Sequence, residues 1–310
     1  MNFINILNHI LRPLEWVVAQ LLTLFHHALV TFGMTAGPSP AWGITIMCLV
    51  LVIRICLLPL FLSQMRAMQR IQVLQPQIQR IQHKYAARKD PRSKEAMQRE
   101  IMALQQRYNA NPLGSCLPSL IQAPILCSLF YTLQSLPAIA DGNAEPLGGI
   151  DHTMAGDIES SSIFGVRIAD SFGTVASPQS RIIIGVAVAL MCLTLFAIQW
   201  MLIHRNTSKD AMVSPQFRVQ KMTVFVFPAI YVVSGATLPF GVLLYWLTNN
   251  LWNLGQTLCQ LRWFPTPGSA AGERKARRDY EQDNRRRAAA GLPSLEEERA
   301  MAAREEAKAR

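Results

Sequence analysis

The hydrophobic residues of this chain gather in long, nearly uninterrupted runs, and polar segments separate the runs. The first long run, Ala41 to Leu62, has the ~20 residues that an α-helix needs to cross a bilayer. The five predicted spans cover residues 41–62, 113–137, 182–203, 222–238 and 239–262. Only Pro239 separates the apolar run that ends at Leu238 from the one that begins at Phe240, so we expect the last two spans to form a tight helical hairpin. The pattern predicts an all-α polytopic membrane protein with a five-helix transmembrane core.

Residues 1–40 have a weaker, amphipathic pattern. A polar stripe recurs at every fourth position and consists of Glu15, Ala19, Thr23, His27 and Thr31. The opposite stripe is apolar and consists of Trp16, Val17, Leu21, Leu24 and Phe25. This pattern favours an N-terminal interfacial helix that lies on the extracytoplasmic membrane surface. The alternative is a sixth span over residues 13–34, because this stretch is also largely apolar.

The charges between the spans predict the orientation of the chain. Residues 63–112 hold ten basic and three acidic residues, and residues 204–221 hold four basic residues and one acidic residue. Residues 138–180, in contrast, hold six acidic residues and one arginine. Lys and Arg collect on the cytoplasmic side of a membrane, so the basic segments are expected in the cytoplasm. The N-terminus and the acidic loop 138–181 are then outside, and the C-terminus is cytoplasmic.

The segment 63–112 is polar but has a helical period. Its apolar side chains recur at steps of three and four, at Met65, Met68, Ile71, Leu74, Ile78, Ile81 and Tyr85, and again at Met97, Ile101, Leu104 and Tyr108. Two helices that join near Pro91 would face these stripes toward each other, as an antiparallel coiled-coil hairpin. Pro76 is expected to kink the first helix. The hairpin is either a solvated structural element or a docking arm for acidic partners, and charge does not separate the two.

Composition narrows the function classes. Half of the residues are hydrophobic, only 16% are charged, and the formal net charge is +10. The six cysteines lie in or beside apolar runs without metal-ligand spacing, so we interpret them as small hydrophobic residues. The sequence shows no nucleotide-binding loop, no HExxH motif and no nucleophile elbow. We therefore expect a protein that is not an enzyme and that uses no cofactor or metal.

Arg54 is the one fixed charge well inside the predicted spans. An arginine at the centre of a membrane helix costs about 2.5–3.5 kcal/mol on insertion scales, so it normally faces protein or water. Two interpretations are open. Arg54 either lines a watery site between helices, or extends to the cytoplasmic interface and contacts lipid phosphate.

Three segments of the chain form a specific combination. They are IRICLLPL around Arg54, NPLGSCLPSLIQAPILCSLFYTL (Asn111 to Leu133) and LPFGVLLYWLTNNLWNLGQ (Leu238 to Gln256). In this order, and with the helical hairpin in its expected place, they resemble the YidC family of membrane insertases (YidC/Alb/Oxa). The resemblance covers residues 40–262 and is to a short form without the large periplasmic domain.

The resemblance implies a membrane protein insertase and chaperone in the bacterial plasma membrane, which acts alone or with the Sec translocon. It also implies a positively charged hydrophilic groove that opens to the cytoplasm and to lipid. The residues that could line this groove are Arg54, Gln122, Gln199, Ser234, Tyr245, Asn249 and Asn253. For the amides, ordinary hydrogen bonds between helices are the alternative role. A small-solute transporter or channel is the alternative function, which five spans without an internal repeat disfavour.

The expected partners are nascent membrane proteins and membrane lipids. By resemblance, they also include the Sec translocon, the ribosome and components of the signal-recognition-particle pathway. The tail 263–310 is rich in Ala, Arg and Glu with Gly and Pro breaks, and is predicted to be disordered. Its basic residues are candidate ribosome contacts through phosphate attraction. They are Arg274, Lys275, Arg277, Arg278, Arg285, Arg286 and Arg287.

Overall fold

The computed structural model describes residues 3–88, 90–108, 110, 117–209, 211–213 and 215–308, and most of these are helical. In chain order the elements are α1 (Phe3–Thr31), α2 (Ala41–Cys56), α3 (Leu58–Val73), α4 (Gln75–Tyr85), α5 (Pro91–Arg107), α6 (Leu117–Ala140), α7 (His152–Ser160), β1 (Ser162–Ile163), β2 (Val166–Arg167), α8 (Pro178–Asn206), η2 (Ala211–Val213), α9 (Pro215–Thr237), α10 (Phe240–Trp263), α11 (Ala270–Ala289) and α12 (Leu295–Lys308). Within the described residues the only sheet is the hairpin β1–β2. The all-α prediction is therefore confirmed, while the motif residues 111–116, with Cys116, lie outside the described part.

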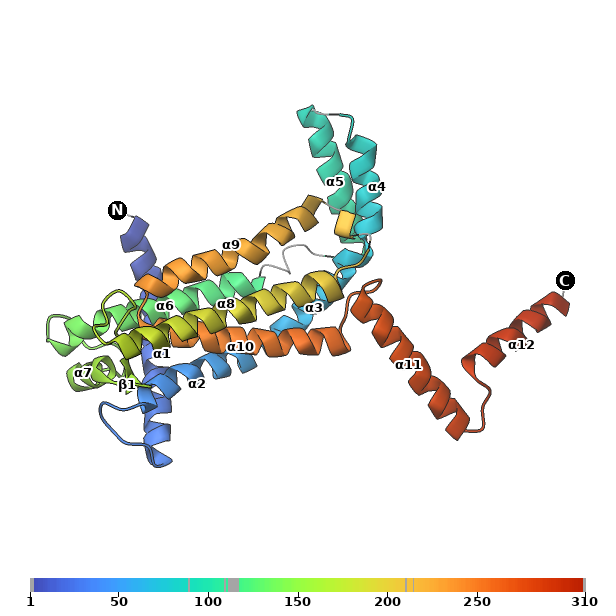
Figure 1. Ribbon diagram of the computed structural model, residues 1–310. Coiled ribbons are helices and arrows are strands. Elements are labelled where there is room, and N and C mark those ends of the chain that lie inside the picture. The colour runs from blue at the N-terminus through green and yellow to red at the C-terminus, as the bar shows by residue number, and fades with distance from the viewer. Residues whose placement is uncertain are drawn as a thin grey trace.

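Five long helices, α2, α6, α8, α9 and α10, run lengthwise in an elongated bundle (Figure 1). Helix α10 is its centre, because it contacts α2, α6 and α8. Its first turns are buried and contribute to two apolar cores. Val242 and Tyr245 pack with residues of α2 and α6, whereas Phe240, Leu243 and Leu244 pack with residues of α8. The two sides of the bundle therefore depend on the same helix.

Four helical segments in the described part of the chain are long and apolar enough to cross a membrane. They are Leu11–Thr31, Ile121–Ala140, Pro178–Asn206 and Phe217–Thr237, and the bent pair α2–α3 passes the same test as one unit. Together with the helical content, this confirms a polytopic membrane protein. Helix α10, the last predicted span, is not among these segments, because amide side chains interrupt its apolar run. Contacts with α2, α6 and α8 surround this helix with protein, and Asn249 has a hydrogen-bond partner on α2.

The predicted span 41–62 is two helices in the structure. Helix α2 ends at Cys56, α3 begins at Leu58, and the two are bent by 54°. Pro59 explains the break, because it has no N–H to donate to the carbonyl one turn earlier and its ring clashes with that turn. The bend places Arg54 in the last turn of α2.

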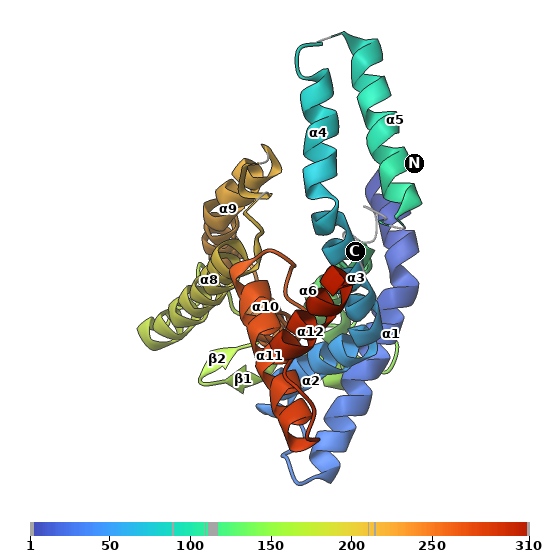
Figure 2. The same cartoon turned by 90° about the vertical axis from the view of Figure 1, so that its right-hand side faces the viewer.

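The segment 63–112 forms the predicted antiparallel pair, with α4 and α5 side by side (Figure 2). The expected kink near Pro76 falls at Leu74, which separates α3 from α4. Leu74 and Ile78 are buried against Ile101 of α5. On the exposed side, Lys84 Nζ lies 2.9 Å from a carboxylate oxygen of Glu100. This hydrogen bond holds the pKa of the Glu100 carboxyl below its usual value.

Helix α1 runs across the long helices, near the end of the bundle that carries α7 and β1 (Figures 1 and 2). Its predicted polar stripe faces protein only in part: Ala19 and Thr23 are buried, whereas His27 and Thr31 are exposed. The apolar stripe is divided as well, since Trp16 and Leu24 are 52% and 60% exposed but Leu21 and Phe25 pack against the core. The buried side of α1 packs closely on the loop after α6, because a Cβ at Gly149 would lie 2.5 Å from Thr23 Oγ1.

Residues 161–175 cover the end of the bundle where α9 turns into α10, and we call them the cap segment. The N–H of Phe240 donates to the carbonyl oxygen of Asp170 at 2.7 Å, and that of Gly241 donates to Ile168 at 2.9 Å. The first N–H groups of a helix have no partner within the helix. The cap segment therefore supplies the acceptors that the first turn of α10 needs.

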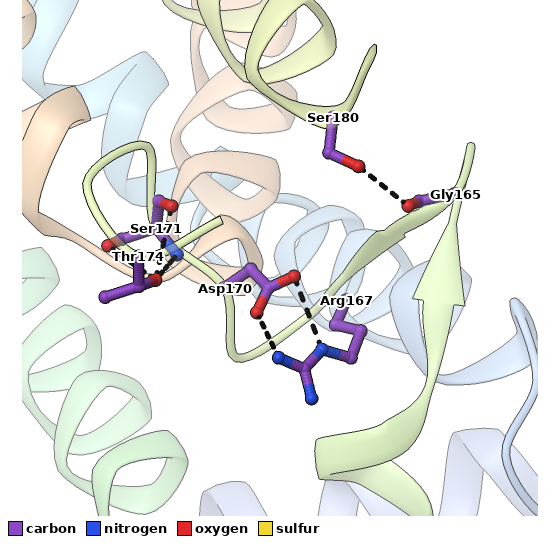
Figure 3. Close-up of polar contacts among 6 residues, drawn as sticks. All are labelled: Gly165, Arg167, Asp170, Ser171, Thr174 and Ser180. Carbon is purple, nitrogen blue, oxygen red and sulfur yellow. Dashed lines mark hydrogen bonds and ion pairs between the residues drawn. The ribbon is translucent and has the colours of Figure 1, made fainter. Parts of the chain in front are cut away.

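Side chains hold the cap segment in place (Figure 3). Arg167 Nη2 and Asp170 Oδ1 form an ion pair at 2.8 Å within the segment. From the first turn of α8, Ser180 Oγ donates to the carbonyl oxygen of Gly165 at 3.1 Å. The cap segment is thereby bonded both to α8 and to the start of α10, and it ties three elements together at this end.

The tail differs from the predicted disordered segment, because residues 270–289 and 295–308 form α11 and α12. Ser269 caps α11 by accepting from the N–H of Gly272 at 3.1 Å. Two ion pairs at i and i+4 support it, Lys275–Asp279 and Arg277–Glu281. These local interactions stabilise α11. The prediction of disorder rested on composition and on the Gly and Pro breaks, and did not take them into account.

Gly241 offers a direct test of the packing between α10 and the cap segment. A Cβ there would lie 2.7 Å from Ile168 Cγ2 and 3.1 Å from Leu133 Cδ1. We expect Gly241→Ala to lower the free energy of unfolding by roughly 1–3 kcal/mol, the usual cost of overpacking. The matched control is Gly255→Ala on the same helix, where nothing lies within 4 Å of the added Cβ. Thermal unfolding in detergent measures both, and equal midpoints would contradict the close contact.

Candidate functional site

The fixed charge of Arg54 meets α10. Its Nε–H donates a hydrogen bond of 2.9 Å to Oδ1 of Asn249, and its Nη2 group donates to the same oxygen. A hydrogen bond from a charged donor is stronger than one between neutral groups. No carboxylate in the described part of the chain forms an ion pair with this guanidinium. The positive charge is therefore compensated by an amide dipole and not by a negative charge.

The break between α2 and α3 also stabilises this charge. Arg54 lies in the last turn of α2, at the end of the helix where the carbonyl groups point outward. The negative end of a helix dipole favours a cation by about 0.3–1 kcal/mol at an exposed site. An unbroken helix over 41–62 would have placed Arg54 in its interior, without this contribution. The bend is thus part of what holds the arginine at this level.

Tyr245 and Gln122 form the second contact. The Nε2 group of Gln122, on α6, donates to the hydroxyl of Tyr245, on α10. Tyr245 is 1% exposed, so its hydroxyl needs a partner within the protein. Tyr245 and Asn249 lie one turn apart on α10 and share a face of that helix.

Four of the predicted site residues are therefore brought together from three helices. We call this set the polar cluster; it consists of Arg54, Gln122, Tyr245 and Asn249. The cluster contains one permanent charge, two amides and one phenol. Arg54 is only half-buried, so a further group can approach it. Such donors match the oxygens of a carboxylate or of a polar peptide segment.

The other three predicted residues stand apart from this cluster. Gln199 lies on α8 and Ser234 on α9, and both are half-buried. Asn253 lies one turn beyond Asn249 on α10. In the residues that the structure describes, no hydrogen bond joins any of these three side chains to the polar cluster. The sequence identified polar residues in spans correctly, but it did not separate those that meet from those that do not.

The structure adds a contact that sequence reasoning missed. The Tyr231 ring, on α9, lies 4.9 Å from that of Trp246, on α10, centroid to centroid. Asn250, beside Asn249, is 1% exposed, and its buried Nδ2 atom has no hydrogen-bond partner among the described residues. The two consecutive asparagines therefore differ, because neighbours on a helix point in different directions. Asn249 bonds Arg54 of α2, whereas Asn250 is buried without a partner for its amide N–H groups.

A cavity of 510 Å³ lies at the hairpin end of the bundle. Its polar lining consists almost entirely of uncharged amide side chains. They are Gln72, Gln75, Gln82, Gln105, Asn206, Gln220 and Gln260. The elements that contribute them include α3, α4, α5, α8, α9 and α10. The cavity therefore joins the helical hairpin to the ends of the long helices.

The basic residues of the tail are not equally available. Lys275 and Arg277 are paired with carboxylates on the same helix, and Arg287 lies 2.6 Å from a carboxylate oxygen of Glu298. Arg278 Nη2 donates to the carbonyl oxygen of Arg262 at 2.9 Å. Arg274 Nε donates to the backbone of α11. The structure records no ion pair for Arg285 or Arg286 among the residues it describes, and both lie on α11.

The fold and the polar cluster define a class of protein. It is an all-α polytopic membrane protein in which several helices bring one arginine and a few uncharged polar groups together inside otherwise apolar segments. The comparisons with known proteins then give the family. The family model described as "60Kd inner membrane protein" matches residues 34–266, so the chain belongs to that family, as its resemblance to YidC predicted.

Curated relatives agree with this assignment. The chain is 44% identical to a protein named "Membrane protein insertase YidC" of Bifidobacterium longum, over 99% of this chain and 91% of the relative. It is 34% identical to the protein of the same name of Streptomyces avermitilis, over 86% of this chain and 61% of the relative. The corresponding protein of Tropheryma whipplei is 30% identical over 88% of this chain and 90% of the relative.

The contact between Arg54 and Asn249 can be tested by stability. We expect Asn249→Ala to lower the free energy of unfolding by roughly 1.5–3 kcal/mol, because it leaves a charged donor without its acceptor. The matched control is Asn253→Ala, one turn further along α10 and outside the polar cluster, for which we expect about 0.5 kcal/mol or less. Unfolding of the purified protein in mixed detergent gives both values. Equal losses would show that Asn249 has no special role.

Proposed function

We propose that this protein inserts integral membrane proteins into the bacterial plasma membrane and helps them to fold. The polar cluster is where it receives the polar outer segment of a substrate. The observation that carries this proposal is the state of Arg54, a permanent charge in an apolar helix whose hydrogen-bond acceptor is a neutral amide. Membership of the family, and the names of the relatives that match over most of this chain, support it.

Because the hydrogen-bond partner of Arg54 is neutral, a substrate carboxylate can replace it. A substrate carboxylate that replaces the Asn249 amide forms a charged pair, which is worth up to ~4 kcal/mol at 4 Å and an effective dielectric of 20. Part of this gain is offset by the lost hydrogen bond to the amide, roughly 1.5–3 kcal/mol. The difference is small, so the substrate is attracted but not trapped. It then leaves sideways as its apolar helix moves into lipid.

The two ends of the bundle have different tasks in this proposal. The end that carries α4, α5 and α11 faces the cytoplasm, because its segments are basic. The end that carries the cap segment faces outside and is closed, and α1 lies along the outer surface of the membrane. A membrane potential that is positive outside moves a substrate carboxylate outward by ~2.3 kcal/mol per charge per 100 mV. The hydrophilic groove therefore opens toward the cytoplasm and lipid only.

The partners follow from the same proposal. The substrates are nascent membrane proteins, delivered by the ribosome and the signal-recognition-particle pathway, and the protein acts alone or with the Sec translocon. No step needs covalent chemistry or a cofactor. Gln199, Ser234 and Asn253 lie along the path that the substrate takes through the groove.

The insertion assay uses the full-length protein in proteoliposomes and a short single-span substrate with an acidic outer segment. We expect Arg54→Ala to reduce insertion at least about tenfold, the loss of ~1.4 kcal/mol of attraction, and Arg54→Lys to retain part of the activity because it keeps the charge. Protection of the outer segment from added protease measures insertion. The control is Gly255→Ala on the same helix, where nothing lies within 4 Å of the added Cβ.

A second substrate makes the outcome specific. The same span with a neutral outer segment should depend much less on Arg54, since no carboxylate is present to meet it. Equal insertion by wild type and Arg54→Ala for both substrates would remove the role of the charge. Failure of the wild-type protein to insert either substrate, together with a measurable flux of small solutes, would favour a transporter instead.

The tail is the proposed ribosome contact. Some of its basic residues are paired with carboxylates among the described residues and others are not, so variants of the two groups can be compared. We expect Arg285→Glu with Arg286→Glu to reduce co-sedimentation with ribosomes more than Lys275→Glu with Arg277→Glu, because carboxylates already neutralise the second pair. Both variants change the net charge equally. Sedimentation at increasing salt measures the contact, and an identical loss for the two variants would leave only a general charge effect.

A further inference from the structure

A second basic site lies outside the polar cluster, on α3. One face of this helix forms the wall of a cavity of 380 Å³, which we call the α3 pocket. Its lining consists of Arg66, Gln69, Arg70, Val73, Leu74, Tyr108 and Pro267. The α3 residues recur at steps of three and four and therefore share one side of the helix. Tyr108 comes from the end of α5, and Pro267 comes from the connection between α10 and α11.

Gln69 holds the pocket together. Its Nε2 group donates to the carbonyl oxygens of Phe264 at 2.7 Å and Pro265 at 3.1 Å. These bonds tie α3 to the segment that follows α10, so the far wall of the pocket is fixed. A neighbouring cavity of 520 Å³ shares Gln69 and Pro267 with the α3 pocket, and its lining includes Trp263. The two cavities therefore adjoin.

The chemistry of the α3 pocket is that of an anion site beside an apolar surface. Its lining contains two guanidinium groups and no carboxylate. Guanidinium groups present planar pairs of donors that match the oxygens of a phosphate. Between and beyond them lie apolar side chains, of which Val73 is 57% exposed. A small hydrated anion gains nothing from such a floor, whereas an amphiphile does.

The pocket also lies at the level where phospholipid headgroups are expected. The apolar part of α3 ends at Leu62, and Arg66 follows one turn later. One turn of an upright helix rises about 5–6 Å, similar to the roughly 5–7 Å headgroup layer on each side of a bilayer. Trp263, at the end of α10, is 59% exposed, and tryptophan is typical of this interface. The bonds of Gln69 place this part of α3 beside the segment that follows Trp263.

We propose that the α3 pocket binds the headgroup phosphate of an anionic phospholipid. Arg66 and Arg70 hold the phosphate, Val73 contacts the outer part of the headgroup, and the acyl chains extend back toward the apolar part of α3, which ends at Leu62. The site is separate from the polar cluster and goes beyond the insertion of substrates. It would anchor the base of the helical hairpin, and with it the root of the tail, to the membrane surface.

Two features favour a lipid over a nucleic acid or a peptide as the ligand. They are the expected level of the pocket in the headgroup layer and the apolar side chains in its lining. Ribosomal RNA presents phosphates without an apolar surface beside them and stays outside the headgroup layer. An acidic peptide is equally charged, but it gains nothing from the neighbouring indole of Trp263 at the bilayer interface. The site therefore fits a lipid phosphodiester best.

The test measures lipid binding to the full-length protein in detergent micelles by native mass spectrometry. Phosphatidylglycerol is the anionic probe, phosphatidylcholine is the zwitterionic one, and glycerol 3-phosphate is the headgroup alone. We expect Arg66→Gln with Arg70→Gln to weaken the binding of phosphatidylglycerol by about 25-fold, roughly fivefold for each arginine near the surface. The control Arg80→Gln with Arg88→Gln removes the same charge from the hairpin outside the pocket, and should leave that binding unchanged.

A second variant protects the test against misfolding. Val73 is exposed, so Val73→Asp should preserve the thermal unfolding midpoint while it places a carboxylate beside the phosphate and abolishes the binding of phosphatidylglycerol. The proposal is overturned if phosphatidylglycerol binds no tighter than phosphatidylcholine, if the control variant loses as much affinity, or if glycerol 3-phosphate competes at equal concentration. Insertion activity is measured separately, so the failure of either proposal is distinguishable from the failure of the other.

Discussion

A permanent positive charge inside an apolar helix is the constraint on which the rest of this structure depends. Arg54 cannot lose its proton, and leaving it in lipid costs several kcal/mol. The protein answers with two features that are far apart in the sequence. The break at Leu57 places the arginine at the carbonyl end of α2, and Asn249 of α10 supplies a neutral acceptor. Neither feature cancels the charge, so Arg54 keeps its attraction for a carboxylate.

Helix α10 carries this arrangement because of its position. It has several amides in its apolar run, and it contacts α2, α6 and α8. Asn249 accepts from Arg54 of α2, and Tyr245 accepts from Gln122 of α6. Its first turn is held by the backbone of the cap segment. A polar helix of this kind is stable in a membrane only when its neighbours are already in place.

The two ends of the bundle also differ in structure and chemistry. At one end, the cap segment holds the first turn of α10 through backbone hydrogen bonds, and α1 packs into an apolar core. At the other end, a cavity lined with amides lies beneath the helical hairpin, and the α3 pocket has two arginines beside apolar side chains. The polar cluster, the amide cavity and the α3 pocket therefore differ in chemistry. The proposed ligands are a substrate carboxylate for the polar cluster and a lipid phosphate for the α3 pocket.

Much of this could be predicted from the sequence, because hydropathy, period and proline placement act locally. The helical character of the spans, the break near Pro76 and the position of Arg54 inside an apolar helix follow from such local rules. The direction in which α1 faces did not follow, because lipid and protein are both apolar and a stripe of Ala and Thr packs as readily as a stripe of Leu. The contact of Arg54 with Asn249, the choice between Asn249 and Asn253, and the bond of Gln122 to Tyr245 were also decided only by the tertiary structure. These pairs join helices that are distant in the chain, and a hydrogen bond depends on distance and direction, which composition and spacing do not contain.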